Sequence, residues 1–376
     1  MTRKTCLALV VLTGLFFVVS AAPAGAQDTI KIGAYLPMTG AVAAYGESEW
    51  AGIQIARDME PEVLGKKIEL KLVDTKSDKI EAANAMTLLV EKERVAVVLG
   101  EAISGNSMAG NPISEAAKIP TVSPTATNPL VNQGKQYAFR ACFIDPFQGE
   151  VAARFAFNDL KAKTAALIID QAQDYAVGLA RFFENEFTKL GGKIVTKTFI
   201  QTGDQDFSAQ LSAVQAAKPE LIYAPNYYTE DALMAKQARD LGITVPILTG
   251  DGAQEAALIE IGGAAVEEVY FTGHFHKQAA TTDRAKEYIR RFEEKHKKEA
   301  DAFGALGADA YFLAVDAIKR AGATDGSKIR DALASTKDFK AVSGTITMGE
   351  NGNPIKSMVI NKVQGGKFVY VTTINP

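Results

Sequence analysis

The sequence predicts an α/β fold made of two Rossmann-like lobes, each with a largely parallel sheet, joined by crossover hinge strands. Short apolar, β-branched runs alternate with stretches of helical period from about residue 30 onward. This is the pattern of a parallel sheet covered by helices on both faces. The same rhythm restarts after "FIDPFQGE" near residue 145. A mature chain of about 350 residues has room for two domains of ordinary size.

The elements follow one another in a regular order. In the first lobe the expected strands are "IKIGAYL", "IELKLVD" and "VAVVLG", and the first two helices are expected to begin near Ser48 and Ile80. In the second lobe the expected strands are "TAALIID", "KIVTKTFI", "ELIYAP" and "VPILTG", each followed by a helical segment. The helices in "EYIRRFEEKHKKEA" and "ALGADAYFLAVDAIKRAG" return to the first lobe, and the β-rich tail from "GTITM" to "FVYVTT" completes the pair.

Short crossovers inside the sheet pattern are expected to join the lobes, because no Gly/Ser-rich or Pro-rich linker separates them. The candidates are "FIDPF" near residue 145 and "FTGHF" near residue 273. With crossovers at these two places, residues 27–145 and 274–350 are expected to form lobe 1, and residues 146–273 and 351–376 to form lobe 2. A lobe assembled from discontinuous segments leaves a cleft spanned by several connections, which suits hinge closure.

The N-terminus has the pattern of a secretory signal peptide over residues 1–26. Arg3 and Lys4 precede an apolar run that begins at Cys6, and the small residues "AGA" end at Ala26. A lipid-anchoring cysteine would follow the apolar run, whereas Cys6 precedes it. We therefore expect export, cleavage near Ala26 and a periplasmic location.

Composition indicates a globular protein, with 47% hydrophobic and 23% charged residues. The formal net charge of −3 argues against a nucleic-acid partner, whose binding draws on clustered cations. Only Cys142 remains after cleavage, so no intramolecular disulfide is expected. No P-loop, G-x-S-x-G or strand-borne G-x-G-x-x-G motif occurs, and we expect neither a cofactor nor catalysis.

Hydroxyl-rich segments follow two expected strands of the first lobe. Ser104 stands where a helix begins after "VAVVLG", and it serves either as a helix cap or as a ligand donor. "TVSPTATNP", residues 121–129, presents hydroxyl and N–H groups from Thr125 to Thr127 in a loop stiffened by two prolines. It is either an ordinary Ser/Thr turn or a row of neutral donors suited to a carboxylate. In open α/β sheets, ligands bind outside the carboxyl ends of the strands.

The segment "GEAISGNSMAGNPISEAAKIPTVSPTATNPLV" resembles the ligand loops of the leucine/isoleucine/valine-binding proteins. The resemblance extends over the mature chain through "IGAYLPMTGAVAAYGES", "DYAVGLA", "GDQDFSAQL", "YYTEDALMAKQARDLGI", "TGDG" and "ALGADAYFLAVDAI". These proteins are periplasmic solute receptors of ABC importers with the type I periplasmic binding protein fold. The resemblance implies that Ser104, Thr125 and Thr127 hold the α-carboxylate of an amino acid and share its ammonium.

In the second lobe the same resemblance places Tyr175 at the cleft wall, Tyr227 at the ammonium and Asp251 as its counter-charge. Asp251 stands where family members carry glutamate, and its alternative role is a helix cap. Tyr227 is alternatively an aromatic at the core edge. The resemblance places Tyr45 and Phe303 against the aliphatic group of the ligand.

Two further features have weaker interpretations. "HFH" at residues 274–276 is a poor candidate for a zinc site, because no third ligand is nearby. Glu101, which is unusual for the family, either tunes ligand preference or is solvated.

The resemblance implies a monomeric receptor that captures an aliphatic amino acid by hinge closure and delivers it to the permease subunits of an ABC transporter. A receptor for an amide or an aromatic carboxylate is the alternative within the same fold. A secreted hydrolase and a sensor domain are alternatives from other classes. The acid at position 251 favours a ligand with a cationic group, and the scarcity of histidine disfavours a hydrolase.

Overall fold

The computed structural model describes residues 29–376, so the expected signal peptide and its cleavage site lie outside the described residues. Two sheets organise this part of the chain. The first sheet contains, in spatial order, β2 (Glu62–Val63), β3 (Lys66–Asp74), β1 (Ile30–Leu36), β4 (Val97–Gly100), β5 (Thr121–Ser123) and β6 (Ala138–Arg140). All its pairings are parallel except that of β2 with β3.

The second sheet combines a parallel part with an antiparallel edge. Its order is β16 (Phe368–Ile374), β15 (Met358–Val363), β11 (Val269–Gly273), β10 (Ile247–Thr249), β9 (Leu221–Tyr223), β7 (Thr164–Asp170) and β8 (Lys193–Ile200). The strands β15 and β16 are the antiparallel members. A separate antiparallel sheet of β12 (Phe339–Lys340), β13 (Thr345–Met348) and β14 (Pro354–Ile355) lies between β11 and β15 in the sequence.

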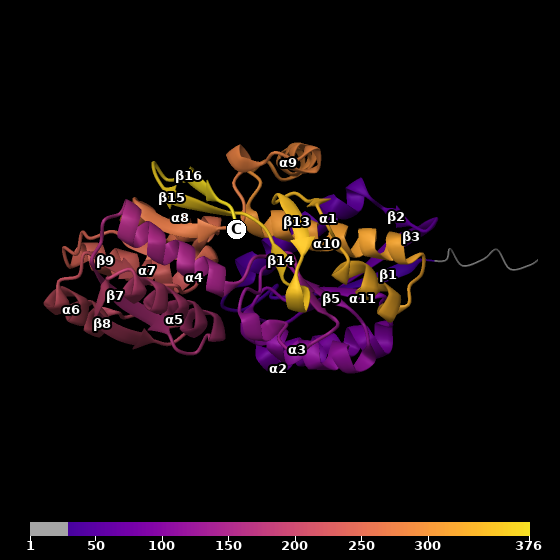
Figure 1. The fold of residues 1–376 in the computed structure, drawn as a ribbon, viewed down its shortest axis with the longest axis horizontal. Coiled ribbons are helices and arrows are strands. Elements are labelled where there is room, and N and C mark those ends of the chain that lie inside the picture. The colour runs from indigo at the N-terminus through magenta and orange to yellow at the C-terminus, as the bar shows by residue number, and fades with distance from the viewer. Residues whose placement is uncertain (1–28) are drawn as a thin grey trace, which may run out of the picture.

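Helices cover both main sheets and define two lobes, which lie side by side in Figure 1. The first lobe, on the right, contains α1 (Ala43–Met59), α2 (Lys79–Thr87), α3 (Ser104–Ala117), α9 (Asp283–His296), α10 (Ala302–Ala321) and α11 (Gly326–Ala334). The second lobe contains α4 (Asp145–Arg154), α5 (Asp174–Lys189), α6 (Ser208–Ala217), α7 (Tyr228–Asp240) and α8 (Ala256–Gly262). The expected two-lobed α/β architecture is confirmed.

The chain passes between the two main sheets three times. The passages follow β6, β11 and β14, so both named crossover segments lie where the chain changes sheets. The exact limits expected for the lobes, 27–145 with 274–350 and 146–273 with 351–376, stay predictions. Three connections of this kind leave a cleft between the lobes that hinge motion can open.

The helix α1 begins at Ala43 rather than near Ser48, so that part of the prediction was wrong. Val42, which precedes it, makes no side-chain capping bond. The start of α1 is hard to predict from the sequence because Gly46, close to it, is a weak helix former. This glycine is needed there because a Cβ at this position would lie 2.4 Å from the carbonyl oxygen of Pro37.

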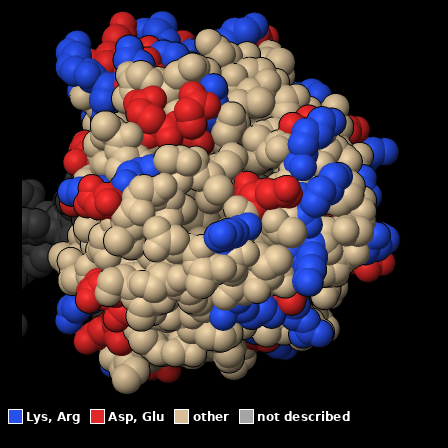
Figure 2. Space-filling model, turned by 90° about the vertical axis from the view of Figure 1, so that its left-hand side faces the viewer, with Lys and Arg blue, Asp and Glu red and all other residues tan. Residues whose placement is uncertain are grey.

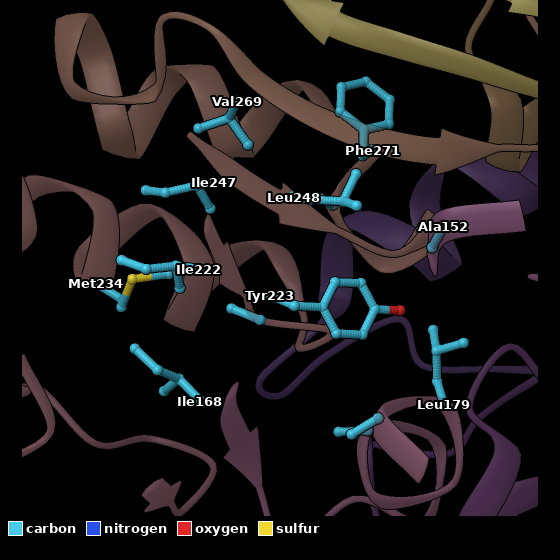
Figure 3. Close-up of a cluster of buried hydrophobic side chains, with 14 of the residues drawn as sticks. Ala152, Ile168, Leu179, Ile222, Tyr223, Met234, Ile247, Leu248, Val269 and Phe271 are labelled. Carbon is cyan, nitrogen blue, oxygen red and sulfur yellow. The ribbon is translucent and has the colours of Figure 1, made fainter. Parts of the chain in front are cut away.

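A large apolar core stabilises the second lobe. Figure 3 shows Ile222, Tyr223 and Leu248 from adjacent strands packed with Met234 from α7 and Leu179 from α5. Each such side chain contributes about 1.5 to 3 kcal/mol when it is fully removed from water. This core holds the ends of β9 and β10 rigidly where the cleft begins.

The surface carries charges of both signs. Figure 2 shows Lys and Arg mixed with Asp and Glu over the end of the second lobe, with broad uncharged areas between them. Within residues 29–376, no helix is long and apolar enough to cross a membrane.

Glycines bring α1 and α10 of the first lobe into direct backbone contact. A Cβ on Gly52 would lie 1.8 Å from the carbonyl oxygen of Gly304, and a Cβ on Gly307 would lie 2.4 Å from that of Glu49. No larger residue fits at these positions without separating the two helices. The crossing therefore fixes α1, which carries Tyr45, against α10, which carries Phe303.

We expect Gly52→Ala to lower the free energy of unfolding by about 1 to 3 kcal/mol, because the added methyl group enters the space of the Gly304 carbonyl. Urea unfolding followed by circular dichroism measures the change. Gln54→Ala, at a half-buried position on the same helix, is the control and should stay within about 0.5 kcal/mol of wild type. Equal stability of Gly52→Ala and wild type would show that the crossing relaxes freely.

Candidate functional site: the cleft between the lobes

The two lobes touch across the cleft through side chains that follow strand ends or begin helices. The Tyr45 hydroxyl donates to the carbonyl of Gly252. Lys79 Nζ lies 2.8 Å from a carboxylate oxygen of Asp174, and Asn128 Nδ2 donates to the Asp174 carbonyl at 2.8 Å. These contacts join the first lobe to the second and describe a closed arrangement.

Four of the predicted aromatic residues converge in this cleft. The ring of Tyr45 stacks on Phe303, with centroids 4.1 Å apart, and meets Tyr227 edge-on at 5.5 Å. Tyr227 in turn stacks on Tyr175 at 5.4 Å. All four side chains are buried, and they come from both lobes. They form an apolar wall with hydroxyl groups at its edges, which suits the aliphatic part of a small ligand.

Asp251 is held by three donors rather than serving as a helix cap. Its Oδ1 accepts hydrogen bonds from Gln148 Nε2 at 2.7 Å and from the Tyr175 hydroxyl at 2.8 Å. Its Oδ2 lies 2.8 Å from His274 Nε2. Burial lowers the pKa of His274, so the ring is neutral near pH 7 and donates its Nε2 hydrogen to the carboxylate. The capping alternative for Asp251 is wrong, because the residue lies inside a short 3-10 helix (Asp251–Ala253) that Gly250 precedes, and the cap of α8 is Glu255.

The hydroxyl row of the first lobe is partly occupied by bonds within the protein. Ser104 begins α3, and its Oγ accepts from the Asn128 backbone N–H at 3.2 Å, so it does not cap its own helix. The Thr125 hydroxyl donates to Glu49 Oε1 at 2.6 Å. Thr127 Oγ1 is buried and has no hydrogen-bond partner among the described residues. Thr127 is therefore the member of the row most ready to bond a ligand.

Asp145 is a buried acid that the sequence analysis did not identify. Neither of its carboxylate oxygens has a hydrogen-bond partner in the described part of the chain. Burial, and then the negative charge of Asp251, raise its pKa well above the ordinary value. The Thr127 hydroxyl and the positive charge of the buried Arg140 oppose this rise without cancelling it. An unpaired buried carboxyl beside Thr127 suits a cationic group on a ligand.

Glu49 is a second acid that the sequence analysis missed. It lies on α1 and is fully buried, and its Oε2 has no hydrogen-bond partner in the described chain. Burial raises its pKa well above the ordinary value, although the Thr125 hydroxyl opposes the change. A neutral Glu49 does not repel a carboxylate that approaches Thr125. Its place directly after Ser48 in a helical pattern gave no sign of this role.

Glu101 is buried rather than solvated, so that alternative is wrong. Its carboxylate accepts from the Thr75 hydroxyl at 2.5 Å, from the Ile103 N–H at 2.5 Å and from Asn106 Nδ2 at 3.1 Å. These bonds tie the end of β3 to the start of α3, where Ser104 lies. Burial raises the pKa of Glu101 to about 7.

The two histidines of "HFH" have other partners than a metal. His274 bonds Asp251, and His276 Nε2 lies 3.3 Å from the Phe368 carbonyl oxygen. Over residues 29–376, no group of three His, Cys, Asp or Glu side chains is placed to hold a metal ion.

Two α/β lobes, a cleft at their strand ends, an aromatic wall, a row of hydroxyls and buried acids together define a solute-binding receptor. The chain belongs to the periplasmic binding protein family, whose model matches residues 29–367. Members of this family are solute-binding components of transporters rather than enzymes. The resemblance to the leucine/isoleucine/valine-binding proteins is thereby confirmed.

Three relatives support this assignment. The Leu/Ile/Val-binding protein BraC3 of Rhizobium johnstonii is 31% identical, over 98% of this chain and 99% of that protein. The leucine-binding protein LivK of Thermotoga maritima is 48% identical with a TM-score of 0.91, covering 93% of this chain and 99% of its own. The branched-chain amino acid transporter substrate-binding protein LivJ of Streptococcus pneumoniae, solved with isoleucine, is 33% identical with a TM-score of 0.88, covering 93% and 100%.

One more distant structure shares the fold alone. It is a solute-binding protein from R. palustris in complex with benzoate, 23% identical with a TM-score of 0.84, covering 93% of this chain and 97% of its own. The fold by itself therefore does not set the chemical class of the ligand.

The buried Glu101 makes stability depend on pH. In the unfolded chain this carboxyl loses its proton near its ordinary pKa of 4.5, whereas in the folded protein it keeps the proton to about pH 7. Between these values the folded state binds more protons, so the free energy of unfolding falls as pH rises. The contribution is on the order of 3 kcal/mol across this window.

We expect Glu101→Gln to remove that component, so that unfolding free energy declines less steeply between pH 4.5 and 7 than in wild type. Urea unfolding at several pH values measures the slopes. Glu91→Gln, at an exposed position in the first lobe, is the matched control and should follow wild type. Parallel curves for Glu101→Gln and wild type would contradict a protonated Glu101.

Proposed function

We propose that this protein is the exported receptor of an ABC importer that captures an aliphatic amino acid between its lobes and delivers it to the permease. The observation that carries the proposal is the convergence of an aromatic wall, a row of hydroxyls and buried acids in one cleft. The relatives that bind leucine or isoleucine support the same ligand class. Export to the periplasm and action as a monomer belong to the proposal.

The ligand carboxylate would bind at Ser104, Thr125 and Thr127 on the first lobe. The Thr125 hydroxyl would turn from Glu49 to the ligand. It would lose its hydrogen bond to Glu49 and form a charge-assisted one to the ligand carboxylate. Burial raises the pKa of Glu49 and so favours its neutral form, which lessens its repulsion of the incoming charge. These hydroxyls bind a carboxylate without burying a full positive charge.

Closure of the second lobe would then surround the ammonium and the side chain. Asp251 and Tyr227 would face the ammonium, and Asp145 lies beside Thr127 as a second acidic group. Tyr45 and Phe303 would pack against the aliphatic side chain, with Tyr175 at the wall. The ligand stabilises the closed state because only there does it contact both lobes.

The buried acids favour an amino acid over an aromatic carboxylate. An acid without an amino group would bring a negative charge beside Asp145 and Asp251 and offer them no cation. The benzoate-bound structure with the same fold shows that this fold accommodates such acids. The two ligand classes therefore need a direct comparison.

We expect leucine, isoleucine or valine to raise the melting temperature of the mature protein after it has been unfolded and refolded to remove bound ligand. A ligand at about 100 times its dissociation constant adds roughly 2.7 kcal/mol, which gives a clear shift. Benzoate and small amides are the comparison compounds. A shift with benzoate alone would overturn the amino-acid assignment and leave the receptor class intact.

We expect Asp251→Ala to weaken amino-acid binding by roughly 2 to 5 kcal/mol, because the ammonium loses its counter-charge in a buried site. Calorimetric titration measures the loss, and circular dichroism checks the fold. Asp240→Ala removes an exposed acid at the end of α7 in the same lobe and should bind as wild type does. Unchanged affinity in Asp251→Ala would remove this residue from the site.

A further inference from the structure

Glu255 joins the two lobes by a single side-chain bond. It precedes α8 in the second lobe, and its Oε1 accepts from the Ser48 hydroxyl of α1 in the first lobe at 2.9 Å. The residue is 5% exposed. Because the partners belong to different lobes, this bond and this burial exist only while the lobes are in contact.

The contact leaves one carboxylate oxygen of Glu255 unpaired. This oxygen, Oε2, is buried and has no hydrogen-bond partner in the described part of the chain. Two charged groups of the first lobe act on Glu255: Asp301, which caps α10, and Lys298, whose Nζ lies 3.7 Å from the Asp301 carboxylate. Closure therefore brings a carboxylate of one lobe towards a carboxylate of the other, which disfavours two negative charges.

We propose that Glu255 is a closure residue that takes up a proton when the lobes meet and releases it when they part. The proposal rests on the proposed function, because closure is driven there by the amino acid. In the closed state, burial first and Asp301 second raise the pKa of Glu255 well above its ordinary value. The Ser48 hydroxyl and Lys298 oppose this rise but do not cancel it.

A cavity of about 380 Å³ gives water access to this pair of acids. It lies between the lobes, and Glu255, Asp301, Phe275 and Phe368 are among its lining residues. The other titratable groups that influence Glu255 or line this cavity are Tyr45, Glu49, Tyr228, Glu260, His276, Lys277, Lys298, Glu299 and Lys367. Proton exchange with solvent therefore needs no further opening of the protein.

Protonation on closure makes binding depend on pH with a definite sign. Above the ordinary pKa of the carboxyl, the open state is ionised while the closed state holds the proton, so the closed state binds more protons. Ligand affinity then falls as pH rises, by up to about tenfold per pH unit where one whole proton is taken up.

Calorimetric titration with L-leucine in two buffers of different ionisation enthalpy counts the protons taken up. At pH 6, we expect uptake in wild type and a lower count in Glu255→Gln, whose amide oxygen still accepts from Ser48. At pH 7.5 we expect Glu255→Gln to bind leucine about three- to tenfold more tightly than wild type. The neutral amide can be buried on closure without first taking up a proton.

Two further variants make the result specific. Asp240→Asn removes an exposed acid at the end of α7 in the same lobe and should keep the wild-type proton count. Ser48→Ala keeps the carboxyl of Glu255 and removes its hydrogen-bond donor. Leucine binding should therefore weaken while proton uptake persists. A lower count of protons taken up in this variant would overturn the inference. Equal proton counts in wild type and Glu255→Gln, with leucine still bound, would overturn the inference about Glu255 and leave the proposed function intact. Failure of every branched-chain amino acid to bind would overturn both.

Discussion

Burial of acidic side chains in and beside the cleft is the constraint on which the site depends. Asp251 is satisfied by three donors, whereas Asp145, Glu49 and Glu255 each keep at least one oxygen unpaired in the described chain. A buried, unpaired carboxylate costs several kcal/mol, so each group is stabilised either by a proton or by a nearby cation. Where such a group lies at the contact between the lobes, as Glu255 does, that contact is linked to protonation.

Much of the fold follows from the sequence because periodicity and burial act locally. The buried parallel strands, including β1 and β7, are near-continuous apolar runs, and their order predicts two sheets joined by crossovers. The start of α1 was misplaced because packing against Pro37 and α10 overrides the weak propensity of Gly46. The small sheet β12–β14 was not separated from the tail, because its strands are only two to four residues long.

The candidate site was predictable in its location and unpredictable in its bonding. Strand ends meet at one edge of each sheet, so hydroxyls and aromatic rings that follow strands are expected to converge. Which of them bond one another depends on contacts between distant residues, such as Thr125 with Glu49 and His274 with Asp251. Asp145 gave no local signal, because an acid before a proline in a crossover is usually solvated.

Tyr45 links ligand size to closure in one side chain. Its ring lies against Phe303 and Tyr227, where the proposed ligand's side chain would pack, and its hydroxyl bonds the Gly252 carbonyl of the opposite lobe. An apolar pocket alone separates ligands by about 1 to 3 kcal/mol per methylene. A ligand that displaces the Tyr45 ring would also break the hydrogen bond from Tyr45 to the Gly252 carbonyl. Such a ligand would lose affinity twice, through its steric misfit and through a less stable closed state. Under the proposed function, the contacts of Tyr45 would therefore set both the selectivity for the ligand's side chain and the stability of the closed form.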